Sequence, residues 1–494
     1  MPFLPVILWT DALIYLLIAA LLGFAWYVRR HEHLLAPWRR VARSASGMSA
    51  LTVLAIFVVV GLLDSLHYRP ALPESAPGTP RYYAVEVLSV FDRVAAPWRL
   101  HREKTYSAPL ATHLYAKEAI DLPDGRQVRD YPRLRYGGAH LDDPAADWAA
   151  DIALRVSLGV SLAAIVWLAI AATLCVQMAR RKTTAFRVAW RELWRGRTEL
   201  PWRAVLVTLA LVLLFVGPAL ALGAGYHLFG TDKVGQDVFY QTLKSIRTGL
   251  VIGTLTTLVM LPFALLLGVM AGYFRGWVDD AIQYVYTTLS SIPSVLLIAA
   301  AVLMMQVYIE THPELFDTIA VRADLRLLFL CVILGITSWT GLARLLRGEA
   351  LKLREMDYIQ AAQAFGVSHW RILTRHIVPN VMHIVLIAVV MDFSGLVLAE
   401  AVLSYVGVGV DPATISFGTM INNARLEMAR DPMVWWSLTA AFLFMLALVL
   451  SANLFADAVR DALDPRIAGR SASPEAPATS ASESSALRPT AERV

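Results

Sequence analysis

Long runs of apolar residues are the feature that most restricts what this chain can fold into. A helix needs about 20 apolar residues to cross the hydrocarbon core of a bilayer, and about nine runs of that length occur. They cover roughly residues 5–27, 48–66, 151–176, 203–225, 245–273, 281–308, 326–345, 381–405 and 433–457. Because 57% of the residues are hydrophobic and only 17% are charged, we predict an all-α polytopic membrane protein with about nine transmembrane helices.

Basic residues beside these runs predict the orientation of the chain. Two loops are rich in them, with Arg29, Arg30, Arg39, Arg40 and Arg43 in the first and Arg180, Arg181, Lys182, Arg187, Arg191, Arg195 and Arg197 in the third. The positive-inside rule makes both loops cytoplasmic, which places the N-terminus outside and the C-terminus inside. The long segment 67–150 is then extracytoplasmic, as either a small domain or an extended, partly ordered loop. Residues 467–494 are rich in Ser, Ala, Pro and Glu, which predicts a disordered tail.

Three of the carboxylates within the apolar runs bear on the interpretation. Asp11 is close to a membrane edge, where its side chain is expected to reach the polar interface. Asp392 and Glu400 lie in the eighth run, where an ionised side chain costs about 2.5–3.5 kcal/mol on insertion scales. Asp392 is the better candidate for a transport pathway, whereas Glu400 suits packing or helix positioning equally well. Pro293 interrupts the sixth run, where we expect a kinked helix and a hinge.

One polar segment between two apolar runs is too regular to be a simple connector. It extends from Asp357 to Asn380 and reads DYIQAAQAFGVSHWRILTRHIVPN. Its residues Tyr358, Ala361, Ala362 and Phe365 are spaced i, i+3, i+4 and i+7, which is one face of a short helix. Asp357 can cap the start of this helix, and Gly366 can end it in a left-handed conformation.

A second short helix is expected after Gly366. Ser368 can cap its start, and Pro379 is expected to end it. Arg371 and Arg375 lie one turn apart on this helix. The result is a helix–Gly–helix elbow with an apolar patch and exposed arginines, which suits docking on another protein. An amphipathic linker that rests on lipid headgroups is the alternative interpretation.

Sequence signatures of enzymes are absent. The chain contains neither GxxxxGK[ST] nor any Gly-Lys dipeptide, so it lacks a phosphate-binding loop and any ATP must be hydrolysed by a partner. No HExxH, CxxC or nucleophile-elbow motif occurs, so we assign no catalytic residue. Cys175 and Cys331 both lie inside apolar runs, which indicates neither a disulfide nor a metal site.

Several stretches together resemble one protein family. In chain order they are FGTDKVGQDVF (229–239), GYFRGWVDD (272–280), the elbow (357–380), LSYVGVGVDPATISFGTMI (403–421) and NLFADAVRDALDPR (453–466). They resemble, in the same order, the inner-membrane permease subunits of ABC importers, specifically the C-type subunit of dipeptide and oligopeptide importers. The chain departs from the family pattern at Gln236, Gln360 and Phe417, where Arg, Glu and Trp are usual. For the turn GTDKVGQD, a structural role is favoured over substrate contact.

The resemblance implies a fold and a site. The last six helices would form a type I permease core, and the elbow would correspond to the family's coupling loop, which docks on an ATPase subunit. The implied coupling residues are Tyr358, Gln360, Ala361, Ala362, Phe365, Gly366, Arg371, Arg375 and Pro379. The pathway candidates are Asp392, Glu400 and Pro293. The implied organisation is two helices in 1–66, an extracytoplasmic segment in 67–150, a third helix and basic linker in 151–202, the core in 203–466 and the tail in 467–494.

The expected function is that of a permease subunit of an ATP-driven importer for di- or oligopeptides or related solutes, in a bacterial inner membrane. Its expected partners are two ABC ATPases, which would bind ATP and Mg²⁺, a second homologous permease, an extracytoplasmic substrate-binding protein and the lipid bilayer. We expect no cofactor in this chain and no nucleic-acid partner. Two alternatives stay open: a proton-coupled secondary transporter that uses Asp392 and Glu400, and a membrane scaffold or sensor built around 67–150.

Overall fold

The apolar runs form long helices, which are accompanied by two small sheets. The computed structural model describes residues 3–72, 82–121, 127–316 and 318–463, so the tail expected at 467–494 lies outside the described residues. The helices are α1 (Trp9–Arg29), α2 (Glu32–Arg43), α3 (Ala45–Asp64), α4 (Val90–Val94), α5 (Ala96–Leu100), α6 (Pro144–Lys182), α7 (Phe186–Trp194), α8 (Trp202–Gly223), α9 (Val238–Phe274), α10 (Gly276–Ser291), α11 (Ser294–Thr311), α12 (Ile319–Arg354), α13 (Asp357–Ala364), α14 (His369–Ile372), α15 (Val378–Val406), α16 (Phe417–Glu427) and α17 (Trp436–Leu463). Strands β1 (Phe3–Val6), β2 (His67–Pro70) and β3 (Leu88–Ser89) form an antiparallel sheet in that order, and β4 (Glu118–Asp121) pairs with β5 (Gln127–Asp130).

Eight helical segments among the described residues are long and apolar enough to cross a membrane, judged by length and composition. They are α1, α3, α6, α8, α9, α11, α17 and the segment His369–Val406, which contains α14 and α15. The expected run 326–345 lies within α12, a helix of 36 residues that is not among these eight segments. The prediction of an all-α polytopic membrane protein is therefore confirmed.

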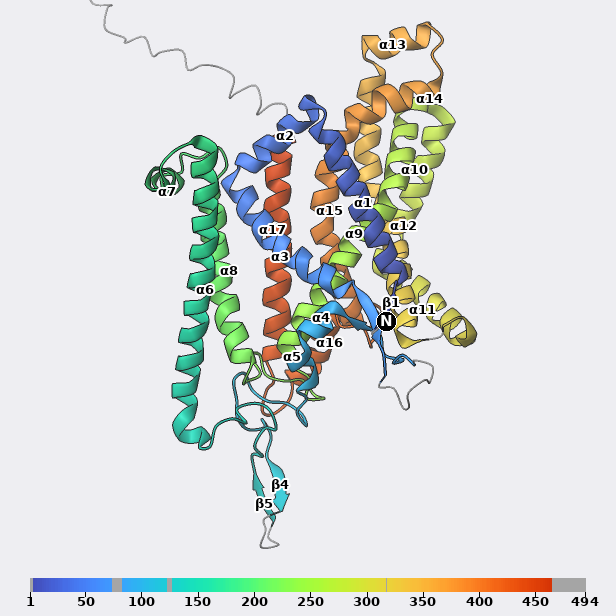
Figure 1. Cartoon of the computed structure of the whole chain (residues 1–494). Helices are drawn as coiled ribbons and strands as arrows, with labels where there is room; N and C mark the ends of the chain where they lie inside the picture. The colour runs from blue at the N-terminus through green and yellow to red at the C-terminus, as the bar shows by residue number, and fades with distance from the viewer. Residues whose placement is uncertain (1–2, 73–81, 122–126, 317, 464–494) are drawn as a thin grey trace, which may run out of the picture.

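The sixth apolar run is broken, where only a kink was expected. α10 ends at Ser291, α11 begins at Ser294, and Ile292 between them is extended. A residue that precedes proline is disfavoured in the helical region, and Ile292 precedes Pro293. The two helices therefore run in different directions (Figure 1).

The α9–α12 pair forms the centre of the helix bundle. A Cβ on Gly268 of α9 would lie 2.7 Å from the carbonyl oxygen of Ala343, and one on Gly272 would lie 2.6 Å from Cβ of Ala350. Small residues let membrane helices approach closely and so increase their van der Waals contact. α15 and α17 pack on α9 as well.

The N-terminal helices contribute unequally to this bundle. α3 lies against both α9 and α17, whereas α8 packs mainly on α6 and α3. α6 and α8 form a close pair, since a Cβ on Gly159 would lie 2.6 Å from Cα of Pro218. Figure 1 shows this pair at one side of the molecule. α3 therefore belongs to the helix group around α9, and the α6–α8 pair stands outside it.

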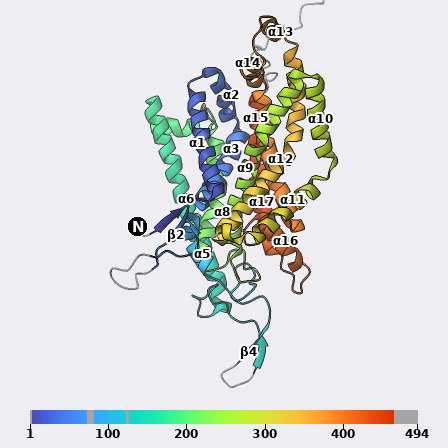
Figure 2. The same ribbon diagram turned by 90° about the vertical axis from the view of Figure 1, so that its right-hand side faces the viewer.

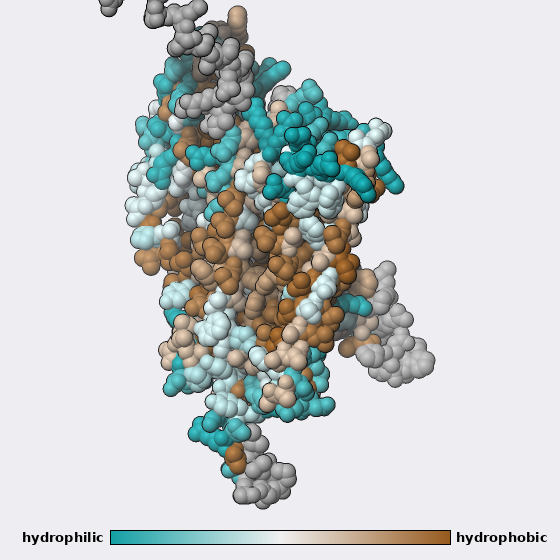
Figure 3. Space-filling model, turned by 90° about the vertical axis from the view of Figure 1, so that its left-hand side faces the viewer, coloured by the Kyte–Doolittle hydropathy of each residue, from teal (hydrophilic) through white to brown (hydrophobic). Residues whose placement is uncertain are grey.

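The two ends of the molecule carry different elements. α2, α7, α13 and α14 lie at one end, and α4, α5, α16 and the β4–β5 hairpin lie at the other (Figures 1 and 2). Seen from the side of α6, a hydrophobic band separates hydrophilic surfaces at the two ends (Figure 3). The arginine-rich loops and the elbow thus share one end, which is the arrangement that the alternation of spans requires.

Residues 101–108 are fastened to the turn that precedes α9. The Glu103 N–H donates to the Gly235 carbonyl oxygen at 2.9 Å, and the Thr231 N–H donates to the Ser107 carbonyl oxygen at 3.1 Å. Gly235 has φ +70°, and a Cβ there would collide with the Glu103 backbone. The GTDKVGQD turn therefore serves as the attachment point of the preceding segment, in line with the favoured structural role.

Candidate functional site

The end of α13 is closed by hydrogen bonds around a left-handed glycine. Gly366 has φ +73°. The Val367 N–H donates to the Ala362 carbonyl oxygen and the Gly366 N–H donates to the Gln363 carbonyl oxygen, both at 3.0 Å. These two bonds form the Schellman pattern, whose left-handed residue is usually glycine. The predicted conformation of Gly366 is confirmed.

The other residues predicted to cap or end the two short helices of the elbow do not have those roles in the structure. The N-cap of α13 is Met356, so Asp357 is the first residue within the helix and caps nothing. Ser368 stands at the N-cap of α14, but its side chain makes no capping hydrogen bond. Pro379 does not end the second helix, because a π-helical turn at Leu373–Ile377 leads directly into α15. Pro379 then lies in the first turn of α15, where its missing N–H is tolerated.

Buried isoleucines fix the elbow to the neighbouring helices. Ile359, Ile372 and Ile377 are 0% exposed and belong to one apolar cluster with Tyr273 of α9. The Tyr273 hydroxyl also lies 2.8 Å from Nδ1 of His369. Burial of each isoleucine contributes about 1.5–3 kcal/mol relative to exposure. The elbow is therefore a firm extension of α9 and α12.

The outward side of the elbow carries exposed aromatic side chains. Phe365 is 87% exposed, Trp370 is 66% exposed and Tyr358 is 45% exposed. Large exposed apolar residues that gather on one protrusion mark an interaction surface. Sequence reasoning missed Trp370, because the helical spacing that selected Tyr358 and Phe365 ends with α13.

The remaining predicted coupling residues lie on the same protrusion. Gln360, Ala361, Arg371, Arg375 and Pro379 are exposed, and Ala362 is partly buried against the isoleucine cluster. The Gln360 side chain donates to the Glu355 carbonyl oxygen at 3.3 Å. Within the described part of the chain, Arg371 and Arg375 have no carboxylate partner. Both guanidinium groups are therefore available to another molecule.

Two ion pairs join α10 and the turn before it to α12 and its C-cap, which lead into the elbow. Arg347 of α12 donates from Nε and Nη2 to the two carboxylate oxygens of Asp279, at 2.6 and 2.7 Å. These hydrogen bonds outweigh burial and lower the pKa of Asp279 below its ordinary value. Arg275, in the turn between α9 and α10, lies 2.6 Å from Glu355. Charge-assisted hydrogen bonds thus connect α10 to the helix that leads into the elbow.

The two acidic residues of α15 have different surroundings. Glu400 is 2% exposed and accepts hydrogen bonds from the hydroxyls of Ser404 at 2.7 Å and Ser416 at 2.8 Å. Because Ser416 is the N-cap of α16, Glu400 ties the start of α16 to α15. Asp392 is partly buried and forms no hydrogen bond or ion pair with any residue that the structure describes. At about 1.5 Å per residue the two carboxylates are about 12 Å apart along the helix, so they do not form one site.

The prediction that Asp11 reaches the membrane surface is wrong. Asp11 is 0% exposed, and Arg247 of α9 donates to it at 2.7 Å. His67 lies 2.7 Å from the other carboxylate oxygen, and Asp324 of α12 lies 3.9 Å from Arg247. Thr10 binds Asp324 through its backbone N–H at 3.1 Å and through its hydroxyl. A buried carboxylate such as that of Asp11 needs a positively charged partner. The Arg247 guanidinium supplies it from a position 236 residues away in the chain.

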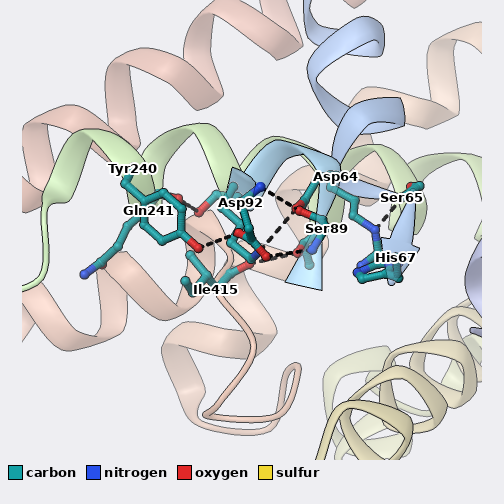
Figure 4. A network of polar contacts seen from close by, with 12 residues as sticks. Asp64, Ser65, His67, Ser89, Asp92, Tyr240, Gln241 and Ile415 are labelled. Carbon is teal, nitrogen blue, oxygen red and sulfur yellow. Dashed lines mark hydrogen bonds and ion pairs between the residues drawn. The ribbon is translucent and has the colours of Figure 1, made fainter. Parts of the chain in front are cut away.

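A second charged cluster lies beside the first on α9. Lys244 Nζ is 2.6 Å from Asp92 and 3.2 Å from Asp64. The Tyr240 hydroxyl donates to Asp92 at 2.7 Å, and the Ser89 hydroxyl donates to Asp64 at 2.6 Å (Figure 4). The two cations of α9 thus bind carboxylates from α1, α3, α4 and α12. The spacing of Tyr240, Lys244 and Arg247, at i, i+4 and i+7, places them on one face of α9. This spacing is the signal in the sequence that could have revealed the two clusters.

A third polar cluster lies outside the spans. His227 is 2.7 Å from Asp237 and 3.4 Å from Glu103. Burial opposes the charge on His227, but the two carboxylates outweigh burial and raise the pKa of His227 to about 9. Burial also opposes ionisation of Glu103. Hydrogen bonds from His227 and from the backbone N–H groups of 135–137 outweigh it and lower the pKa of Glu103 to about 2.

Raising the pH is expected to release residues 101–108 from the turn before α9. The pKa of His227 is about 9 in the folded state against an ordinary 6.5, so its stabilising contribution is complete below pH 6.5 and is lost as the pH rises through 9. For Glu103 the contribution is complete above pH 4.5 and is lost as the pH falls towards 2. Limited proteolysis should therefore cleave this segment faster at pH 10 than at pH 6. His227→Gln should be cleaved rapidly at both pH values, and equal resistance of the unmodified protein at both would refute the assignment.

Comparison with known proteins identifies the family. A profile described as "Binding-protein-dependent transport system inner membrane component" matches residues 264–469. The oligopeptide transport system permease protein OppC of Mycobacterium tuberculosis (strain ATCC 25618 / H37Rv) is 34% identical over 239 residues, which make up 48% of this chain and 76% of the relative. This chain belongs to the permease subunits of ABC importers. The family resemblance and the permease function predicted from the sequence are confirmed.

Two further relatives extend the match of this permease. The glutathione transport system permease protein GsiD of Pectobacterium atrosepticum is 30% identical over 307 residues, 57% of the permease and 92% of the relative. The dipeptide transport system permease protein DppC of Bacillus subtilis is 26% identical over 293 residues, 56% and 85% of the two chains. The part matched by the family profile contains the elbow and both acidic residues of α15, whereas α1–α8 precede it. Membership implies ATPase and substrate-binding partners for the permease.

Proposed function

We propose that this permease forms half of the translocation pathway of an importer for di- or oligopeptides or related solutes. The observation that carries the proposal is the elbow, an ordered protrusion fixed by Ile359, Ile372 and Ile377 and bearing exposed Phe365 and Trp370. The relatives described above are named as permeases for oligopeptides, dipeptides and glutathione, which supports a peptide-like substrate.

The elbow couples the ATPases to the membrane helices. Its exposed aromatic side chains enter a cleft on an ATPase subunit, and Arg371 and Arg375 bind acidic groups beside that cleft. Because α14 continues through the π-helical turn into α15, a displacement of the elbow moves α15. The pair between Asp279 and Arg347 carries the same displacement to α10. Such a movement requires that the ATPase binds two conformations with different affinity.

The assembled importer contains two ATPase subunits, this permease, a second homologous permease and an extracytoplasmic substrate-binding protein. The ATPases bind ATP and Mg²⁺, because this chain lacks a phosphate-binding loop, and the permease itself catalyses no reaction. The end that carries the elbow, α2 and α7 faces the cytoplasm of a bacterial cell, with the N-terminus outside and the C-terminus inside. The arginine-rich loops at that end support this orientation.

The proposed organisation keeps two helices in 1–66, an extracytoplasmic segment in 67–150, a helix and basic linker in 151–202 and the core in 203–466. The packing changes this organisation in one respect. α3, which packs on α9 and α17, belongs to the core in place of α8, which packs mainly on α6 and α3. Within the core, Asp392 faces the pathway, Glu400 positions α16, and the break at Pro293 gives α11 freedom to hinge.

Site-specific photo-cross-linking tests the proposed docking of the elbow. With a photoreactive residue at Phe365, the permease should cross-link to an ATPase subunit expressed with it. The matched control is Tyr131, which is also exposed but lies at the opposite end next to β5. An ATPase adduct at Phe365 and none at Tyr131 is the expected result. Adducts at neither position, or at both equally, would sink the proposed docking.

A further inference from the structure

We propose that a groove between α6 and α7 binds the headgroup of an anionic phospholipid at the elbow end of the membrane. The groove has a volume of about 790 Å³. It is lined by Leu168 and Ala172 of α6 and by Phe186, Arg187, Trp190, Arg191, Trp194 and Arg195 of α7 and its C-cap. The inference is independent of the transported substrate and of the coupling mechanism.

The groove is built from fixed elements. Ala189 and Leu193, on the inner side of α7, are 1% and 0% exposed, and Leu193 packs in a cluster with Ala171 of α6 and Leu206 of α8. The Trp167 indole N–H donates to the Leu206 carbonyl oxygen at 2.8 Å. α7 is therefore held against the α6–α8 pair without any added ligand.

Tryptophan rings form one side of the groove. The rings of Phe186 and Trp190 are stacked at 6.1 Å, and those of Trp190 and Trp194 meet at 6.0 Å. Indole rings favour the membrane–water interface, because one edge is apolar and the other donates a hydrogen bond. The aromatic wall thus sets the groove at the depth of the headgroups.

Three arginines supply the charge. Arg187, Arg191 and Arg195 follow one another at intervals of four, which aligns them along one face of α7. None of them pairs with a carboxylate among the described residues, since Glu192 of the same helix is 2.9 Å from Lys182. Guanidinium groups bind phosphate oxygens through paired hydrogen bonds. A row of three such groups without an internal counter-ion matches a phosphodiester headgroup.

The apolar side of the groove selects a lipid over a soluble anion. Leu168 and Ala172 lie on α6, which is long and apolar enough to cross a membrane. Leu162, Ile165 and Leu168 are exposed along the same helix and offer a track for an acyl chain. A free phosphate would use the arginines alone, whereas a phospholipid uses both surfaces.

Native mass spectrometry of the purified full-length permease tests this site, with dioleoyl phosphatidylglycerol and dioleoyl phosphatidylcholine as probes. Replacing Arg187, Arg191 and Arg195 together by Gln should weaken phosphatidylglycerol binding at least about tenfold and leave phosphatidylcholine binding unchanged. The matched control replaces Arg180, Arg181 and Arg197, which lie outside the groove, by Gln and should change binding less than about threefold. Circular dichroism confirms that both variants are folded.

Each other outcome overturns the proposal. Equal losses in both triple variants would mean general attraction of anions to a basic segment, and an unchanged groove variant would mean that the arginines bind nothing. Competition by millimolar inorganic phosphate, or by a soluble acidic peptide, would assign the row of arginines to a soluble anion or an acidic protein. Retained phosphatidylglycerol binding in their presence is the result that we expect.

Discussion

Gly366→Val is expected to reduce the amount of ATPase that co-purifies with the permease about 5–30-fold while membrane insertion stays normal. Gly366 has φ +73°, and apart from its chain neighbours no described residue has an atom within 4 Å of the position that a Cβ would occupy. The cost therefore comes from the backbone alone, about 1–2 kcal/mol for an L-residue in the left-handed region. Loss of the two capping hydrogen bonds would turn Phe365 away from its docking position. ATP-dependent uptake should fall by a similar factor.

Two variants control for effects unrelated to backbone conformation. Gly366→Asn should retain most of the ATPase, because asparagine tolerates the left-handed conformation better than other non-glycine residues. Gly348→Val changes a glycine of α12 that also has open space around it and no positive φ, and it should behave like the unmodified protein. If Gly366→Val retains full ATPase binding, or if Gly348→Val loses as much, the elbow is not the docking element.

Arg247→Met is expected to have the largest effect on stability. The side chain is almost as long as the original but cannot pair with Asp11 or Asp324, which are 0% and 5% exposed. Removing one partner of a buried ion pair costs about 3–5 kcal/mol, because the other charge is left without compensation. This loss is a large fraction of the free energy of unfolding of a typical domain, about 5–15 kcal/mol. Thermal unfolding in detergent should show a large decrease in transition temperature, together with a lower yield.

The double variant Arg247→Met/Asp11→Asn shows whether the stability loss comes from the broken ion pair or from lost side-chain contacts of Arg247. It removes the stranded carboxylate and should recover part of the stability, which a simple loss of side-chain contacts would not allow. Arg322→Met is the matched control, since Arg322 is exposed and has no carboxylate partner in the described part of the chain. A transition temperature for Arg247→Met equal to that of Arg322→Met would show that the ion pairs do not hold α1 to the core.

Local patterns predicted the helices and the elbow well, because both depend on the spacing of neighbouring residues. The apolar runs became helices, and Gly366 adopted the left-handed conformation that its position after an amphipathic helix indicated. Pro379 was misjudged for a different reason. A proline is compatible with the first turn of a helix, and the π-helical turn before it could not be read from residue types.

Long-range contacts could not be read from the chain. The sequence shows Asp11 as an isolated acid near the end of an apolar run, and only the fold brings Arg247 and His67 to it. The same holds for α3, which takes its place beside α9 although two other spans, α6 and α8, separate the two in sequence. From the sequence, Arg187, Arg191 and Arg195 indicate only the cytoplasmic side of the membrane. The groove that they line exists because α7 packs against α6, which the sequence does not show.

ATP-driven uptake of a labelled dipeptide into proteoliposomes measures the central proposal most directly. The vesicles contain the permease with its partner permease, both ATPases and the binding protein. Uptake should require ATP and the ATPases, survive a protonophore, and fall with Gly366→Val. Uptake that continues without the ATPases and collapses with a protonophore would instead indicate a secondary transporter. Absence of flux from a fully assembled complex that hydrolyses ATP would contradict a role in peptide transport.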